Sequence, residues 1–148
     1  MENDLKGEVA MTDTNPSIMS HVSLGTNNFE NAIKFYDKVM ATIGAKRVME
    51  FEGAVAYGKE YPEFWVQTPE NGKAAQTANG THFGFIAESK EEVHAFWDAA
   101  ISMGATPNGE PGPRPHYGEP YYGCFVIDLD GHKIEATFWD ASIEFTGH

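Results

Sequence analysis

The segment YYGCFVIDLDGHKIEATFW, residues 121–139, decides how the rest of the chain is interpreted. The Asp-Gly pair at 130–131 separates two runs rich in aromatic and β-branched residues, which predicts two strands joined by a tight turn. Because side chains alternate between the faces of a strand, Ile134 and Ala136 are predicted on one face and Glu135 on the other. A carboxylate on a half-closed sheet face needs a partner, either a cation on a neighbouring side chain or a metal ion.

Composition limits the class of protein. The 148 residues have the apolar and charged fractions of an ordinary globular protein, and this length suits one domain. The formal net charge of -12 argues against nucleic acid or an anionic membrane as the main partner, because both repel an acidic surface. Cys124, the single cysteine, is predicted to be a small core residue in a reducing compartment. With no apolar run near the roughly 20 residues of a membrane span and no signal-peptide pattern, we expect a soluble, cytoplasmic protein.

The chain divides by composition into two tails, two modules and a connector. The modules and connector together form one predicted domain, residues 17–140. The predicted bounds are 1–16 for the polar N-terminal tail, 17–68 for module one, 69–80 for the connector, 81–140 for module two and 141–148 for the C-terminal tail.

Each module begins with a predicted strand followed by an amphipathic helix. The helices have capping-box starts at Asn27 and Ser89 and end at Gly44 and Gly104. The segment 107–120 holds five prolines and three glycines in fourteen residues, which predicts a shaped loop. The predicted strands are 18–24, 46–51, 54–58, 63–67, 81–87 and the two strands of the 121–139 hairpin.

An internal repeat then determines the predicted fold. Aligning SHVSLGTNNFENAIKFYDKVMATIGAKRV with THFGFIAESKEEVHAFWDAAISMGATPN places His21 on His82, and an aromatic pair follows each histidine by fourteen residues. The repeat predicts an α+β fold of two paired βαβββ modules that form a curved, cup-shaped mixed sheet with helices on the outer face. The other face would then carry His21, His82 and Glu135 together.

Two imidazoles and one carboxylate on a common face are typical ligands of a divalent metal ion. Three protein ligands leave coordination positions open for water or substrate, as in catalytic zinc sites, and the same set also serves non-haem Fe(II). We therefore expect one divalent ion, Zn, Ni, Mn or Fe. The alternative is a hydrogen-bonded polar cluster without an ion.

These residues resemble the vicinal oxygen chelate superfamily of glyoxalases, bleomycin resistance proteins and extradiol dioxygenases. The resemblance runs from Ile18 to Trp139 and rests on SHVSLGTNNFENAIKFYDKV, GTHFGFIA and DLDGHKIEATFW. In metal-dependent members the ligands are a His in the first strand of each module and a Glu in the last strand, which match His21, His82 and Glu135. The resemblance implies a metal that binds two adjacent oxygen atoms of a small-molecule substrate and stabilises an enediolate-like anion.

One position departs from the glyoxalase I pattern. That enzyme has a fourth ligand, usually Glu, late in the first module, and the repeat places this position near Trp65 or Gln67. Gln67 could ligate through its carbonyl oxygen, whereas Trp65 could not. The remaining set of two His and one Glu is equally similar to the dioxygenases and the fosfomycin-modifying thiol transferases.

The segment RPHYGEPYYG, residues 114–123, is predicted to be a lid that carries functional groups over the site. An arginine fork suits an anionic substrate group, a histidine or Glu135 suits proton transfer, and tyrosines suit hydrogen bonding to developing charge. Each has an ordinary structural alternative: a salt bridge, a solvated loop residue or a core aromatic. The catalytic candidates are Glu135, His116 and Tyr122, and the substrate-binding candidates are Arg114, Tyr117 and Trp65.

Three functions remain open at this point. The first is a metal-dependent lyase or isomerase of the glyoxalase kind. The second is an extradiol Fe(II) dioxygenase in which His116 assists. The third is a non-catalytic drug- or metabolite-binding protein with an aromatic groove formed by Trp65, Tyr57 and Tyr122. The resemblance also implies a homodimer, with each site built within one chain or across two.

Overall fold

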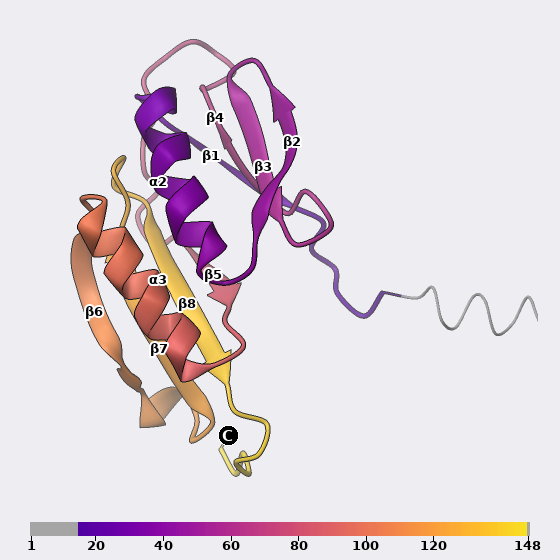
Figure 1. Cartoon of the computed structure of the whole chain (residues 1–148), viewed down its shortest axis with the longest axis vertical. Coiled ribbons are helices and arrows are strands. Elements are labelled where there is room, and N and C mark those ends of the chain that lie inside the picture. Colours follow the sequence, from indigo (N-terminus) through magenta and orange to yellow (C-terminus); the bar gives the residue numbers. More distant parts are fainter. Residues whose placement is uncertain (1–14, 148) are drawn as a thin grey trace, which may run out of the picture.

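The computed structural model describes residues 15–147 and has an α+β architecture of two four-stranded mixed sheets, each accompanied by one helix (Figure 1). Residues 1–14 of the predicted N-terminal tail lie outside this range. The first module contains β1 (Val22–Gly25), α2 (Phe29–Ala41), β2 (Lys46–Phe51), β3 (Ala54–Gly58) and β4 (Phe64–Gln67). The second contains β5 (His82–Ile86), α3 (Lys90–Ser102), β6 (Thr106–Pro113), the 3-10 helix η1 (Pro115–Tyr117), β7 (Tyr121–Ile127) and β8 (Lys133–Trp139).

The two modules repeat one topology. The first sheet has the order β1-β4-β3-β2 and the second has the order β5-β8-β7-β6. In each, the first strand is parallel to the last and the remaining pairs are antiparallel. This confirms the predicted βαβββ modules. The sheets are separate, however, because β1 and β5 do not pair with each other in the described chain.

Both helices begin with the side-chain caps that the sequence favours. Ser89 Oγ accepts a hydrogen bond from Glu92 N at the start of α3, as predicted. At α2 the cap is Asn28, whose side chain accepts from Asn31 N, so the predicted start at Asn27 is one residue early. Asn27 instead contacts the connector through Ala75, whose N–H donates to Asn27 Oδ1 at 2.7 Å.

One hydrophobic core joins the modules. It contains the inward residues of both helices and of both sheets. The ring of Phe64 in β4 lies 6.0 Å from that of Phe83 and 4.9 Å from that of Phe85 in β5, so the helix-side faces of the two sheets meet there. We call the face of each sheet that lacks a helix its open face. Since the helix-side faces share a core, the two open faces point away from it.

Two predicted segments need correction. The first strand begins at Val22 rather than Ile18, because its only partner in the described chain, β4, starts at Phe64 opposite Val22. The predicted loop over 107–120 is also wrong in its first half, since β6 runs to Pro113. It is an edge strand, where a proline without an N–H donor leaves no sheet partner unsatisfied, and its register shifts at Gly109 and Gly112.

The β7–β8 turn ties the second module to the first. Asp128 is buried and accepts hydrogen bonds from the N–H groups of Asp130 and His132 and, at 2.5 Å, from Tyr36 OH of α2. Burial, followed by the charge of Asp128, raises the pKa of Tyr36 well above its ordinary value, which keeps this phenol a donor. His132 Nε2 lies 2.7 Å from the carbonyl oxygen of Gly25. The hairpin turn therefore connects the two modules through buried and partly buried hydrogen bonds.

Cys124 is the core residue that its strand position predicts. It is fully buried, and burial raises the pKa of its thiol to about 12. Near pH 8 the buried thiol is therefore far less ionised than a free cysteine, whose pKa is about 8.5. We expect native protein to resist Ellman's reagent and protein in concentrated guanidinium chloride to react with one equivalent. Equal rates in the two states would contradict this placement.

Candidate metal centre

His82 and Glu135 meet on the open face of the second sheet. His82 begins β5, Glu135 lies in the middle of the neighbouring β8, and His82 Nε2 is 3.2 Å from Glu135 Oε1. The side chain of Glu135 is only 10% exposed, whereas that of His82 is 46% exposed. The pair thus has a buried carboxylate and an imidazole open to a ligand.

Two glycines make room for this arrangement. Gly84 lies opposite Glu135 in the sheet, and a Cβ there would lie 3.2 Å from Glu135 Oε1. Gly123 lies under the ring of Tyr121, where a Cβ would come within 2.3 Å of the phenol oxygen. Any larger residue at 123 would displace that ring. The absent side chains let Tyr121 lie along β7 and reach Glu135.

Tyr121 fixes the second oxygen of the carboxylate. Its hydroxyl donates a hydrogen bond to Glu135 Oε2 at 2.5 Å. Burial is the main cause that raises the pKa of Tyr121, and the hydrogen bond to Glu135 adds to it, so the phenol remains a donor through the physiological range. One carboxylate oxygen is held by Tyr121 and the other faces His82. Such partners orient the ligands of metal sites.

The separation of the two donor atoms fits a shared divalent ion. Two atoms bound to one ion at about 2.0–2.2 Å lie roughly 3 Å apart, close to the distance between His82 and Glu135. The same distance also permits a direct hydrogen bond. No three His, Cys, Asp or Glu side chains within residues 15–147 are grouped closely enough to hold an ion. The pair is therefore two thirds of the predicted ligand set.

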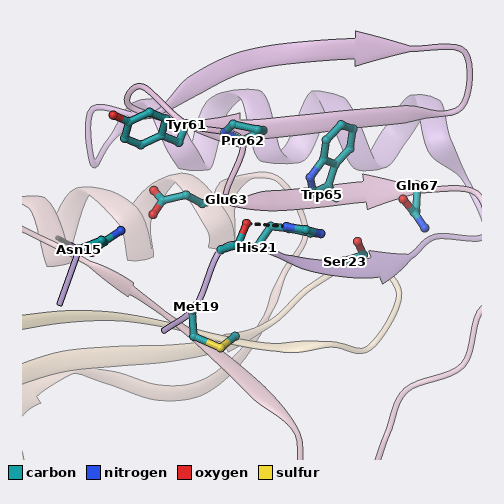
Figure 2. Close-up of a pocket in the computed structure, with 10 residues that line it drawn as sticks. Asn15, Met19, His21, Ser23, Tyr61, Pro62, Glu63, Trp65 and Gln67 are labelled. Carbon is teal, nitrogen blue, oxygen red and sulfur yellow. Dashed lines mark hydrogen bonds between the residues drawn. The ribbon is translucent and has the colours of Figure 1, made fainter. Parts of the chain in front are cut away.

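His21 belongs to a second hollow, on the first sheet. It precedes β1 and lines, with Trp65 and Gln67 of β4, a hollow of about 640 Å³ (Figure 2). Its Nδ1 lies 2.9 Å from Ser20 Oγ, which leaves Nε2 without a hydrogen-bond partner among the residues described. His21 and His82 also both border a groove of about 590 Å³ between β1 and β5. Within one chain His21 nevertheless stays apart from the His82–Glu135 pair.

Trp65, one of the two aromatic residues that line that hollow, lies on the open face. Trp65 stacks on Phe51 of β2 with ring centroids 6.1 Å apart. Glu63 borders the hollow beside Trp65 and Gln67 (Figure 2), and it is a carboxylate that the sequence reasoning passed over. The period-two alternation over 63–67 would have identified it, because residues 63, 65 and 67 share a face.

Three of the four lid candidates contact the rings of β7 residues or of each other. Tyr117 in η1 packs on Tyr121 with centroids 5.0 Å apart, so it lies next to the carboxylate's hydrogen-bond donor. His116 is exposed and packs on Tyr117 at 4.2 Å. The guanidinium of Arg114 lies over the ring of Phe125, the residue opposite Glu135 in β7.

Tyr122 is the candidate that the structure places on the other side of the sheet. It is opposite Phe138 in β8, on the helix side, and its hydroxyl lies 2.6 Å from His94 Nε2 of α3. The tyrosine beside Glu135 is Tyr121, which sequence reasoning missed. The observed register pairs Phe125 with Glu135, which puts Tyr121 on the face of Glu135, whereas a two-residue turn at Asp130 and Gly131 would have paired Val126 with Glu135 and favoured Tyr122.

No helix within residues 15–147 has both the length and the apolar character needed to cross a membrane.

Comparison with known proteins identifies the family of this chain. Residues 18–136 match the Glyoxalase/Bleomycin resistance protein/Dioxygenase superfamily. A glyoxalase/bleomycin resistance protein from Albidiferax ferrireducens is similar at 36% identity and a TM-score of 0.75, over 82% of this chain and 98% of that one. A search of curated proteins finds no match.

Two more distant structures share the fold. One is a glyoxalase-related enzyme from Fulvimarina pelagi, at 18% identity and a TM-score of 0.64, over 90% of this chain and 100% of that one. The other is the genomically encoded fosfomycin resistance protein FosX from Listeria monocytogenes, at 16% identity and a TM-score of 0.61, over 86% and 98%. From the match over most of its length, the chain belongs to the glyoxalase/bleomycin resistance protein/dioxygenase superfamily.

Proposed function

We propose that the protein is a metal-dependent lyase or isomerase of the glyoxalase kind, acting on a small substrate with adjacent oxygen atoms. The observation that carries this proposal is the His82–Glu135 pair with Tyr121 on the second carboxylate oxygen. An imidazole and a buried, oriented carboxylate are the donor chemistry of an open divalent site. When bound, the ion would act as a Lewis acid on the substrate oxygens.

His21 of a second copy would complete the ligand set. Both β1 and β5 are edge strands, each with one partner in the described chain, and edges of this kind readily pair with another chain. Near these edges two apolar side chains are exposed, Ile86 of β5 at 74% and Met19 before β1 at 61%. A homodimer that joins the first sheet of one copy to the second sheet of the other would bring His21 to His82 and Glu135.

The chain's own residues would then orient the carboxylate, restrict water and transfer the proton. Tyr121 holds Glu135 in one orientation, so that the carboxylate presents a fixed oxygen to the substrate. Tyr117 packs on Tyr121 at one side of this region, where the two rings would limit access of water. His116, exposed beside Tyr117, is the candidate that exchanges the proton with solvent, since an imidazole can both accept and donate a proton.

A second candidate function is ligand sequestration without chemistry. It is favoured by the hollow on the first sheet, where Trp65 stacks on Phe51 and Tyr61 borders the same space. A planar aromatic compound suits such a surface. The Fe(II) dioxygenase remains the alternative enzyme with the same ligand set.

Metal analysis of protein purified without a chelating tag tests the proposal. We expect about one Zn, Ni or Mn ion per chain, because each complete site needs one His82–Glu135 pair. Mass spectrometry of the digested protein would measure the metal. Stoichiometric iron would favour the dioxygenase, and protein that fails to bind any of these ions after incubation would contradict both enzymes and favour sequestration.

A further inference from the structure

We propose that Arg114 and Lys133 form an anion-binding subsite around Phe125, beside Glu135, and that the substrate carries a carboxylate, phosphonate or similar oxyanion. This inference rests on the proposed function for its statement about the substrate. The binding of the anion itself is a separate property of these three side chains.

Phe125 is the centre of the subsite. It lies opposite Glu135 in the β7–β8 ladder and therefore on the same open face, and its ring is 6.0 Å from that of His82. Lys133 Nζ lies 4.7 Å from the ring centroid, and the guanidinium carbon of Arg114 lies 6.0 Å from it. Two cations thus converge on one buried ring next to the candidate metal ligands.

The backbone of β6 is shaped to hold Arg114 at this position. The arginine lies over Gly109, where a Cβ would come within 3.2 Å both of its Nη2 and of the Phe125 ring, and Gly109 has a φ of +150°. Its Nη2 donates to Glu110 O at 2.7 Å and its Nη1 to Gly112 O at 3.0 Å. The glycines that break the register of β6 therefore make space for a fixed guanidinium.

Neither cation has an anionic partner. Within residues 15–147 no carboxylate lies within 4.0 Å of Arg114 or Lys133, although the chain carries twelve more acidic than basic residues. Arg47, the other arginine, pairs with Asp37 and Glu50.

Arg114 and Lys133 also have hydrogen-bond donors that no group in the described structure accepts. The three hydrogen bonds of Arg114 leave at least two of its five N–H donors free, and Lys133 makes no side-chain hydrogen bond in the described structure. Arg114 and Lys133 thus lie beside the same ring, carry positive charge without an anionic partner and have free N–H donors. This arrangement suits an oxyanion that accepts hydrogen bonds from both side chains. The substrate would place this group on the Phe125 side and its reacting oxygens at His82 and Glu135.

Binding of benzoate and phenylphosphonate, with neutral benzamide as the matched probe, tests the subsite. NMR titration of the full chain should show both anions binding, and benzamide at least about tenfold more weakly. Lys133→Gln and Arg114→Gln should each weaken benzoate by about tenfold or more. Lys90→Gln is the control, because Lys90 Nζ also lies over a ring of this sheet, that of Tyr122 at 5.1 Å, but on the helix side.

The outcomes separate this subsite from the metal centre. Equal affinities for benzoate and benzamide, or for the parent and Lys133→Gln, would overturn the subsite even in protein with stoichiometric metal. Charge-dependent benzoate binding in protein that takes up no metal would support it and would contradict only the proposed function. Thermal unfolding of each variant checks that β6 is intact, and Lys133→Gln decides the result if Arg114→Gln unfolds.

Discussion

His82→Ala protein is expected to bind less than about a tenth of the divalent metal bound by the parent, because one of three protein ligands is removed and the remaining two, Glu135 and His21, hold an ion weakly. His21→Ala should lose metal to the same extent, although His21 lies apart from Glu135 within one chain. His94→Ala is the matched control, since this histidine is exposed on α3 and its Nε2 faces Tyr122. Unchanged metal in His82→Ala would show that the ligand assignment is wrong.

Coexpression of the two variants distinguishes a shared site from a site within one chain. In a mixed dimer, His21 of the His82→Ala copy meets His82 and Glu135 of the His21→Ala copy, so one of the two sites is complete. Random assembly would restore metal at about a quarter of all sites. A site built within a single chain would give no recovery. Metal content of the coexpressed protein therefore tests the dimer and the ligand set together.

Asp128→Ala is expected to lower the free energy of unfolding by about 3 kcal/mol, since the buried Tyr36 hydroxyl and the His132 N–H both lose their acceptor. Urea unfolding followed by tryptophan fluorescence would measure the loss at one fixed protein concentration. The metal site lies on the other face of the sheet, so metal content of the folded variant should be unchanged.

The control for this prediction is Asp98→Ala. Asp98 is exposed on α3, and no hydrogen bond or ion pair of its side chain occurs in the described residues, so the change should stay within about 0.5 kcal/mol. Tyr36→Phe should cost less than Asp128→Ala, because the two turn N–H groups keep their acceptor. If Asp128→Ala lowered the free energy of unfolding by less than about 1 kcal/mol, the proposed role of Asp128 in connecting the modules would be contradicted.

The sequence by itself determined the repeated topology and the two faces of each strand. Equivalent positions of His21 and His82 gave the two βαβββ modules, and period-two alternation placed Ile134 and Ala136 in the core and Glu135 on the open face. These features are local, because the alternation of a strand and the stripe of a helix depend only on neighbouring residues.

Only the tertiary structure decided which side chains meet. The β7–β8 register selected Tyr121 over Tyr122 as the partner of Glu135, and the path of β6 carried Arg114 back over Phe125. The helix-side faces of the two sheets share one core, so the open faces point in different directions. His21 therefore lies apart from the His82–Glu135 pair within one chain. Such contacts depend on the packing of segments far apart in the sequence, which no local pattern encodes.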